Sequence, residues 1–281
     1  MRRDLFAAAL AVIIFYMKKI AVITGASSGM GRDFALLLNN FFKVDEIWLM
    51  ARRKERLILL AEEMQSHGNM PKARIIEADI SGKSGVNRFA ELLEAENKNS
   101  GDFEISLLIN NAGFGTYGTF EDTPLDTELN MIELNCISLT GFCGIALKYM
   151  KSGAHIINTA SLAAFLPLGN FAVYGATKSF VLSFSTALAA ELKPRGISVC
   201  ALCPGPVSTE FANIASGGAR KEVLHGLSGR KVVEHCLKKA SKGKYIAIMA
   251  FKWKFKAFMS RFISKYAGAD FTFKYCKRPH N

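Results

Sequence analysis

Short apolar runs alternate with segments of helical periodicity along most of the chain, and this alternation limits the fold more than any other feature. The runs are residues 20–25, 46–53, 73–80, 105–113, 154–161, 197–207 and, more weakly, 245–250. Short runs that are apolar throughout predict strands buried on both faces, and strands separated by helices indicate βαβ units. We therefore predict an α/β fold with an open, doubly wound parallel sheet and helices on both faces. Such a sheet binds ligands beyond the carboxyl ends of its strands.

The same pattern sets the domain organisation. Half of the 281 residues are hydrophobic, which is enough for a sizeable core, and one α/β domain of this length is common. We predict a single domain over residues 17–250, with a lid at residues 211–230 in which Gly217 and Gly218 would act as hinges. Residues 251–281 form a basic, amphipathic tail.

The first 16 residues allow three interpretations. The apolar run from Leu5 to Met17 has thirteen residues, which is short for a membrane-spanning helix of about 20. A signal sequence is one interpretation, although no small-x-small cleavage motif follows the run. A peripheral membrane anchor is the second. The third, which we favour, is that translation starts at Met17, because a predicted strand follows it directly.

The six cysteines show no paired arrangement typical of a metal site. Cys200 and Cys203 make a single CxxC, but this motif lies in an apolar run where cysteine acts as a small hydrophobic residue. We therefore predict no metal ligands. This cysteine usage fits a reducing compartment and favours a cytoplasmic location.

A glycine-rich segment directly follows the first predicted strand. Its sequence, TGASSGMG, has the spacing G-x-x-x-G-x-G. Glycine permits the tight turn and lets the backbone approach a pyrophosphate, while the following helix directs free N–H groups at the anion. We predict that this segment binds a dinucleotide cofactor, with contacts from Gly25, Ser27, Ser28, Gly29, Met30 and Gly31.

The end of the second strand indicates which dinucleotide is bound. A carboxylate there would accept a hydrogen bond from the ribose 2′-hydroxyl, but the sequence is MARR, with Arg52 and Arg53 and no acidic residue. Arginine pairs with phosphate through its planar guanidinium. We therefore predict NADP(H) rather than NAD(H). The alternative is that both arginines belong to a solvated helix start.

The third and fourth predicted strands end in further candidates for cofactor contacts. At Asp79, followed by Ile80, a carboxylate would accept a hydrogen bond from the adenine amino group. Asp79 would also suit the N-cap position of the next helix, and the two roles can coexist. The motif NNAG supplies Asn111, Ala112 and Gly113, which would form a close backbone wall against the cofactor.

These pieces, taken in order, resemble the short-chain dehydrogenase/reductase family. The matching motifs are TGASSGMG, NNAG, Asn135, Ser161, YGATK and PGPVST, spread over residues 20–210. The resemblance implies a Rossmann-type sheet of about seven strands, usually in a homodimer or homotetramer. It also implies hydride transfer between NAD(P)H and a carbonyl or alcohol carbon.

The resemblance assigns roles to four residues. Tyr174 would be the general acid/base, Lys178 would assist it, Ser161 would orient the carbonyl, and Asn135 would support a chain of waters. The chemistry agrees, because Tyr174 and Lys178 are spaced i, i+4 on one helix face, and a nearby ammonium favours phenolate. The loop PGPVST resembles the family's cofactor-capping segment, with contacts from Pro204, Gly205, Val207 and Thr209.

The segments around these residues indicate an apolar substrate. Residues 113–118 and 170–174 would wall the cleft, which suits a 3-oxoacyl chain, a ketosteroid-like molecule or another hydrophobic ketone. The alternative function is an NADP(H)-sensing binding protein without turnover. The complete set of Asn135, Ser161, Tyr174 and Lys178 argues against it, because a sensor needs no acid/base pair.

The positive charge of the chain belongs to its last part. The net charge is +12, and residues 217–281 hold 16 Lys/Arg against 3 Asp/Glu. A solvated basic face is one interpretation, and contact with an anionic membrane or an acyl-CoA-type substrate is another. If the tail forms one amphipathic helix, it would lie in a membrane interface, pack on the body or contact a second subunit. Since no recognition motif is present, we expect no nucleic acid partner.

Overall fold

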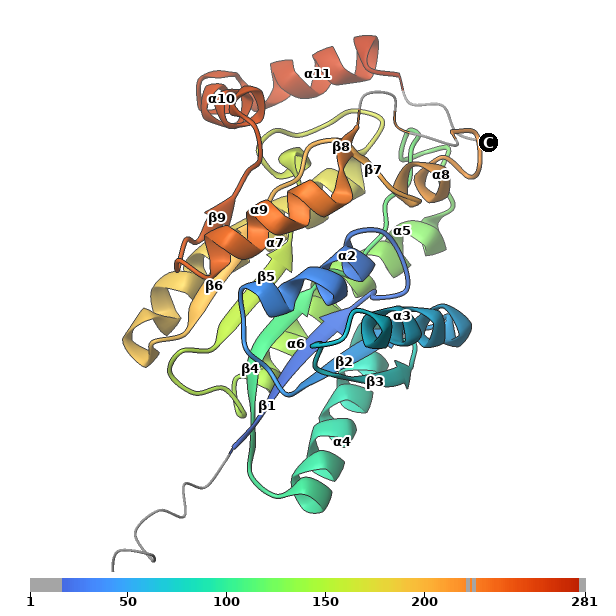
Figure 1. Cartoon of the computed structure of the whole chain (residues 1–281). Helices are drawn as coiled ribbons and strands as arrows, with labels where there is room; N and C mark the ends of the chain where they lie inside the picture. The colour runs from blue at the N-terminus through green and yellow to red at the C-terminus, as the bar shows by residue number, and fades with distance from the viewer. Residues whose placement is uncertain (1–16, 221–222, 224–225, 278–281) are drawn as a thin grey trace, which may run out of the picture.

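The computed structural model describes residues 17–220, 223 and 226–277, and its centre is a seven-stranded parallel sheet. The strand order is β3-β2-β1-β4-β5-β6-β9 (Figure 1). From β1 the chain builds outward to β3, then crosses back to place β4 on the other side of β1. This confirms the predicted doubly wound α/β sheet. Its strands are β1 (Lys18–Thr24), β2 (Glu46–Ala51), β3 (Lys72–Glu77), β4 (Phe103–Asn110), β5 (His155–Thr159), β6 (Ser198–Leu202) and β9 (Ile246–Ala247).

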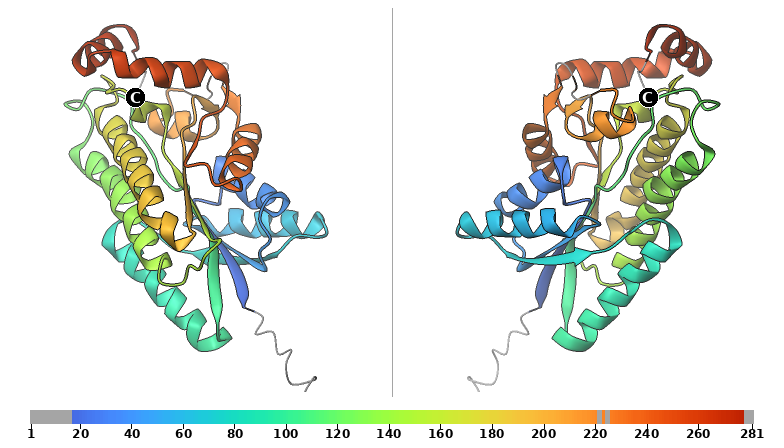
Figure 2. Two further views of the ribbon diagram at one scale, coloured as in Figure 1. Left: turned by 90° about the vertical axis from the view of Figure 1, so that its left-hand side faces the viewer. Right: turned by 90° about the vertical axis from the view of Figure 1, so that its right-hand side faces the viewer.

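Helices cover both faces of the sheet (Figure 2). Because successive strand residues point to opposite faces, Ala21 and Ile23 enter one core while Ile20 and Val22 enter the other. The first core is closed by α2 (Gly29–Leu37), α3 (Lys54–Ser66) and α9 (Gly229–Ala240). The second is closed by α4 (Gly82–Ser100), α6 (Leu139–Ala146) and α7 (Ala172–Leu192). Burial on both faces explains why the strands are apolar throughout.

Several strands are shorter than their apolar runs. β2 ends at Ala51 and not at residue 53, and β6 ends at Leu202, just before the Pro-Gly-Pro loop. The last strand, β9, has two residues and, among the strands that the structure describes, pairs with β6 alone. In each case the end of the apolar run supplies the loop that follows the strand.

The helical segment that spans residues 125–146 is interrupted. α5 (Leu125–Ile132) continues into a π-helical turn, Glu133–Ser138, and then into α6, which ends at Ala146. By length and composition this helix meets the criteria for a membrane span, with a mean hydropathy of 1.3. However, it packs between α4 and α7 in the second core, as a core helix does.

The tail departs from the prediction of one amphipathic helix. It forms α10 (Phe251–Met259), a 3₁₀ turn (Ser260–Phe262) and α11 (Lys265–Tyr275). Ile263, in extended backbone conformation, separates the two helices. Both helices lie across the end of the molecule at which the sheet strands finish (Figure 1). The predicted extension at residues 1–16 lies outside the described residues.

Short helices, strands and turns complete the fold. In the predicted lid, Gly217 and Gly218 both have positive φ, a conformation that glycine adopts without steric strain. The remaining helices and strands are α8 (Phe211–Ala215), β7 (Val207–Ser208), β8 (Leu227–Ser228) and 3₁₀ turns at Leu38–Asn40, Leu162–Ala164 and Lys193–Arg195.

Candidate active site

The four predicted catalytic residues gather at the carboxyl end of β5. Ser161 lies two residues beyond the strand, Asn135 lies in the π-helical turn, and Tyr174 and Lys178 lie in the first two turns of α7. All four are buried. The Ser161 hydroxyl accepts a hydrogen bond from the Ala163 backbone N–H at 3.1 Å and caps a short 3₁₀ turn. The fold therefore brings four polar side chains from three segments to one place.

Lys178 and Tyr174 lie side by side on α7. The Lys178 ammonium is 5.7 Å from the centroid of the Tyr174 ring, and it donates a 2.8 Å hydrogen bond to the Thr159 carbonyl oxygen at the end of β5. Burial lowers the pKa of Lys178 from 10.5 to about 8. A cation held this close to a phenol favours the phenolate form.

Asn135 ties the site to the loop after β4. Its amide nitrogen donates to the Phe114 carbonyl oxygen at 2.9 Å and to the Thr177 hydroxyl at 3.1 Å, and its amide oxygen accepts from the Phe114 N–H at 3.2 Å. A methyl group on Gly113 would lie 2.7 Å from that oxygen and 3.4 Å from the Lys178 nitrogen. Gly113 therefore lets the loop backbone run against the catalytic side chains.

Aromatic rings pack around Tyr174 at one side of the candidate active site. The Tyr174 ring stacks on Phe171 with 4.1 Å between centroids, and Phe211 lies 5.3 Å away on α8. Tyr117 meets Phe171 edge to face at 5.1 Å. The Tyr117 N–H donates to the Ala215 carbonyl oxygen at 2.6 Å, which joins the lid to residues 113–118. The residues predicted as cleft walls therefore line the tyrosine directly.

The glycine-rich loop forms a close turn before α2. Gly25 and Gly29 have φ of +68° and +51°, where a side chain is strained, and a methyl group on Gly31 would overlap the Gly25 carbonyl oxygen. Ser27, Ser28 and Met30 occupy the same turn, and the first turn of α2 begins at Gly29. Bare backbone at a helix N-terminus fits the pyrophosphate of a dinucleotide.

Arg53 crosses this loop. It donates to the Ser27 hydroxyl at 3.0 Å and to the Ser28 hydroxyl at 2.7 Å, and it pairs with Glu210 at 3.0 Å. Arg56, one turn further along α3, pairs with the same carboxylate. Hydrogen bonds from Arg56 and then Arg53 lower the pKa of Glu210. Two guanidinium groups thus hold one anion beside the loop.

The two arginines predicted to bind the cofactor phosphate differ in their contacts. Arg52 is exposed, whereas Arg53 is the one that contacts the loop. Arg56 and Glu210 were not predicted from the sequence. The spacing of Arg56, three residues after Arg53 on a helix, was a usable signal, but the sequence offers none for Glu210.

The predicted cofactor contacts that follow the third and fourth strands differ in their exposure and in their hydrogen bonds. Asp79 is exposed and accepts a hydrogen bond from the Ser81 N–H at 3.0 Å; the N-cap of α4 is Ser81, so the N-cap role for Asp79 is wrong. Ile80 is buried. The Asn111 amide donates to the Thr24 carbonyl oxygen at 3.2 Å and so joins β1 to the loop after β4.

The loop after β6 runs over the glycine-rich turn. A methyl group on Gly29 would lie 3.4 Å from Thr209 of this loop, whereas one on Gly25 would lie 2.9 Å from the Cα of Ala112 in the loop after β4. Val207 pairs with Leu227 in the small sheet of β7 and β8. Pro204 accepts a hydrogen bond from the Leu162 N–H at 3.0 Å, next to Ser161. Gly205 packs against Trp253 of the tail. This loop therefore spans from the glycine-rich turn to the tail.

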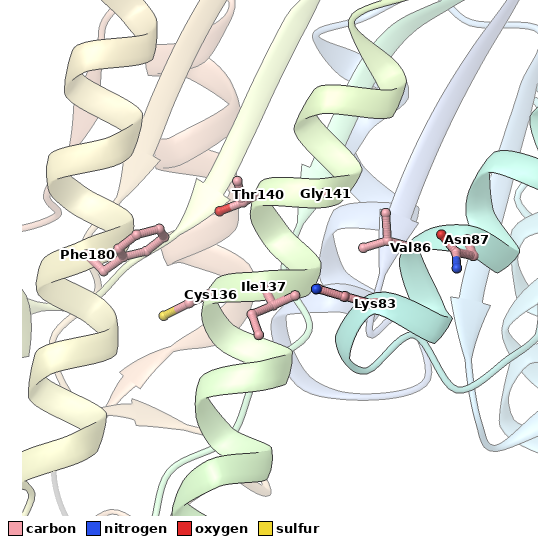
Figure 3. A pocket seen from close by; sticks show the side chains of 8 residues that line it. All are labelled: Lys83, Val86, Asn87, Cys136, Ile137, Thr140, Gly141 and Phe180. Atoms are coloured by element: carbon pink, nitrogen blue, oxygen red, sulfur yellow. The ribbon is translucent and has the colours of Figure 1, made fainter.

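A separate hollow of about 500 Å³ lies on the outer side of the same helices (Figure 3). Lys83 from α4, Cys136 and Ile137 from the π-helical turn, and Phe180 from α7 line it. None of the four catalytic candidates does, so it is not the substrate cleft. Among the residues that the structure describes, no group of three His, Cys, Asp or Glu side chains could hold a metal.

Comparison with known proteins places this geometry in a family. The family model for short chain dehydrogenase matches residues 19–217, which include the glycine-rich turn and all four catalytic candidates. The chain belongs to the short-chain dehydrogenase/reductase family. It is thus an NAD(P)-dependent oxidoreductase that acts on a small molecule.

Individual relatives agree with this assignment. An uncharacterized oxidoreductase of Staphylococcus epidermidis is 32% identical over 208 residues, covering 73% of this chain and 85% of the relative. The short-chain dehydrogenase from Sphingobium yanoikuyae in complex with NADPH is 26% identical with a TM-score of 0.73, covering 87% of this chain and 93% of that one. The bulky-bulky ketone specific alcohol dehydrogenase from Comamonas testosteroni is 26% identical with a TM-score of 0.67, covering 86% and 91%.

Proposed function

We propose that this enzyme reduces an apolar ketone with NADPH, using Tyr174 as the proton donor. The observation that carries the proposal is the buried pair of Tyr174 and Lys178 on one face of α7, beside Ser161 at the carboxyl end of β5. A phenol becomes a useful proton donor near neutral pH only where its surroundings stabilise phenolate, and the adjacent ammonium does so.

Each side chain then has a definite task. Bound NADPH supplies the hydride. The Tyr174 hydroxyl donates a proton to the substrate oxygen, and the Lys178 ammonium stabilises the phenolate that remains. The Ser161 hydroxyl donates a hydrogen bond to the same oxygen. Asn135 fixes the loop at Phe114 through two hydrogen bonds, which keeps the cleft wall in place.

The aromatic enclosure supports an apolar substrate. Phe171 and Phe211 lie against the Tyr174 ring and Tyr117 packs on Phe171, so a substrate carbonyl that reaches Tyr174 lies among rings. Burial of apolar substrate surface there contributes about 25 cal/mol per Å². The ketone specificity named for the Comamonas testosteroni relative supports the same class of substrate.

An NADPH-oxidation screen tests the proposed reaction. The panel contains 3-oxoacyl thioesters, ketosteroids and short water-soluble aldehydes and ketones. We expect kcat/KM to rise with the apolar surface of the substrate, because the ring-lined cleft binds that surface. If no carbonyl compound in the panel is reduced, or if polar aldehydes are the best substrates, the proposal is wrong.

The anion site at the glycine-rich loop supports NADP(H) over NAD(H). Arg53 and Arg56 hold the Glu210 carboxylate, and Arg53 also contacts the hydroxyls of Ser27 and Ser28. A ribose 2′-phosphate carries more charge than a carboxylate and offers more acceptor oxygens for the same guanidinium donors. We infer that it takes the place of Glu210 when the cofactor binds, and that Glu210 competes with it.

Two substitutions test this competition. We expect Arg53→Ala to lower kcat/KM for NADPH about 10- to 100-fold and to change that for NADH little, because a hydrogen bond to a charged group is worth about 1.5–3 kcal/mol. Glu210→Gln removes the competing charge and should tighten NADPH binding. Lys54→Ala is the control, since Lys54 is a neighbouring cation that pairs instead with Glu77. A wild-type preference for NADH, or an equal loss with both cofactors, contradicts the assignment.

We also propose a homodimeric or homotetrameric enzyme in the cytoplasm. The hollow lined by Ile137 and Phe180 lies on an apolar helix face that suits a second copy. Cys136, Cys143, Cys200, Cys203 and Cys236 are buried as free thiols, which fits a reducing compartment. A monomer in sedimentation equilibrium would contradict the proposed homodimer or homotetramer. Co-fractionation of the protein with a secreted marker would contradict the cytoplasmic location.

A further inference from the structure

Helices α10 and α11 and the 3₁₀ turn between them carry the most exposed large apolar side chains that the structure describes. Phe251, Phe262, Tyr266 and Tyr275 are 81%, 70%, 81% and 73% exposed. Among the described residues outside the tail, the most exposed large apolar side chain is Leu59, at 64%. We call the exposed side chains of residues 251–277 the tail surface. So many strongly exposed rings within one short segment indicate an interaction site.

Positive charge is interleaved with these rings. Residues 251–277 contain seven lysines and arginines and one acidic residue, Asp270. The cations contact the rings: the Lys252 and Lys256 ammonium groups lie 4.8 and 5.0 Å from the Trp253 ring centroid, and the Arg261 guanidinium lies 6.0 Å from that of Phe258. Helices that combine apolar rings with lysine and arginine are typical of membrane interfaces.

The inner side of the tail is already occupied by the body. A methyl group on Gly205 would lie 2.8 Å from the Trp253 indole, so the indole packs on the loop after β6. The Gly169 N–H donates to the Thr272 hydroxyl at 2.8 Å, and the Asn170 amide donates to the Phe273 carbonyl oxygen at 3.1 Å. The exposed rings therefore cannot turn inward without breaking these contacts, and within the part of the chain that the structure describes they remain open to a partner.

We propose that the tail surface lies in the headgroup region of an anionic lipid bilayer. Each lysine or arginine near such a surface gains about 1 kcal/mol, and the apolar rings enter the boundary of the acyl chains. A second copy fits less well, because a two-fold interface places a surface against itself and would oppose two strongly basic patches.

The position of the tail connects the bilayer to the cleft. Gly169 and Asn170, which α11 contacts, directly precede Phe171, and Phe171 stacks on Tyr174. The tail surface thus holds the substrate wall at the membrane. Resting on the proposed ketone reductase function, this assigns the substrate class: a neutral ketone that partitions into lipid and enters the cleft from the bilayer side.

Vesicle flotation of the full chain tests the proposal. The vesicles contain either phosphatidylcholine alone or phosphatidylcholine with phosphatidylglycerol. We expect the wild type to float with the anionic vesicles at low salt and to be released at high salt. Replacing Lys252, Lys254 and Lys256 by Gln should weaken binding about 100-fold, given the gain per charge at the surface.

Two more triple variants separate apolar burial from charge. Phe251→Ser/Phe262→Ser/Tyr266→Ser should lose at least about tenfold in binding, because interfacial binding scales with buried apolar area. The matched control is Leu59→Ser/Phe120→Ser/Leu125→Ser, whose side chains are exposed but lie outside the tail. It should bind as the wild type does. Since every altered residue is exposed, all variants should unfold at similar temperatures.

These experiments distinguish a failure of the membrane proposal from a failure of the proposed reductase function. No wild-type flotation at low salt, or equal losses in the tail and control variants, overturns the membrane proposal. A tail variant that loses a subunit in sedimentation equilibrium assigns the surface to a second copy and also overturns it. Turnover of a water-soluble ketone is measured beside each assay. If turnover persists without vesicle binding, the reductase function stands and only the membrane contact falls.

Discussion

The Tyr174→Phe enzyme is expected to lose about 10²- to 10⁴-fold in kcat for ketone reduction while binding NADPH about as tightly as the wild type. The substitution removes only the hydroxyl group. The ring contacts with Phe171 and Phe211, at 4.1 and 5.3 Å between centroids, are available to phenylalanine as well. The loss therefore reports the missing proton donor and not a collapsed cleft.

Single-turnover kinetics and NADPH fluorescence titration separate the two quantities. Tyr117→Phe is the matched control, because Tyr117 is a second buried tyrosine in the same aromatic cluster and contacts Phe171 from the other side. We expect the control to keep most of its kcat. Tyr174→Phe with wild-type turnover would remove Tyr174 from the mechanism. Weak NADPH binding in that variant would show that the side chain acts on the cofactor instead.

The parts of the site that the sequence predicts are those set by local patterns. An apolar run ending in a polar residue places that residue at the ligand end of the sheet, and Ser161 followed this rule. The i, i+4 spacing put Tyr174 and Lys178 on one helix face. Asn135 is only partly predictable from the sequence. Asparagine is unfavourable inside a helix, which indicates a polar role, but only the structure shows the π-helical turn that holds it.

The parts that the sequence does not predict depend on contacts between distant segments. Glu210 meets Arg53 across more than 150 residues, and no local pattern encodes which carboxylate reaches an exposed arginine. The packing of the tail could not be predicted from the sequence either. An amphipathic pattern indicates that one side of a helix is buried, but it does not identify the residues that bury it. Its partners are the glycines at positions 169 and 205, whose missing side chains make room for Phe273 and Trp253.

Lys178→Met is expected to abolish most activity and yet to stabilise the fold. Burial lowers the pKa of Lys178 from 10.5 to about 8, so folding at neutral pH places a charge where it is disfavoured. Each pKa unit corresponds to about 1.4 kcal/mol, which puts the cost at about 3 kcal/mol. Losing the hydrogen bond to the Thr159 carbonyl oxygen offsets about 1 kcal/mol of this.

The pH dependence identifies the cause. Because the folded-state pKa of Lys178 lies below the unfolded value, the unfolded chain binds more protons between pH 8 and 10.5, and wild-type stability rises through that window. Methionine does not titrate, so the variant's advantage is full below pH 8 and is lost by pH 10.5. Urea unfolding across this pH range measures the difference in stability between the variant and the wild type. Lys193→Met, at an exposed lysine, is the control.

A stability advantage that stays constant with pH would mean that methionine stabilises by packing alone. An enzyme that keeps its turnover without Lys178 would show that the ammonium does not support the tyrosine.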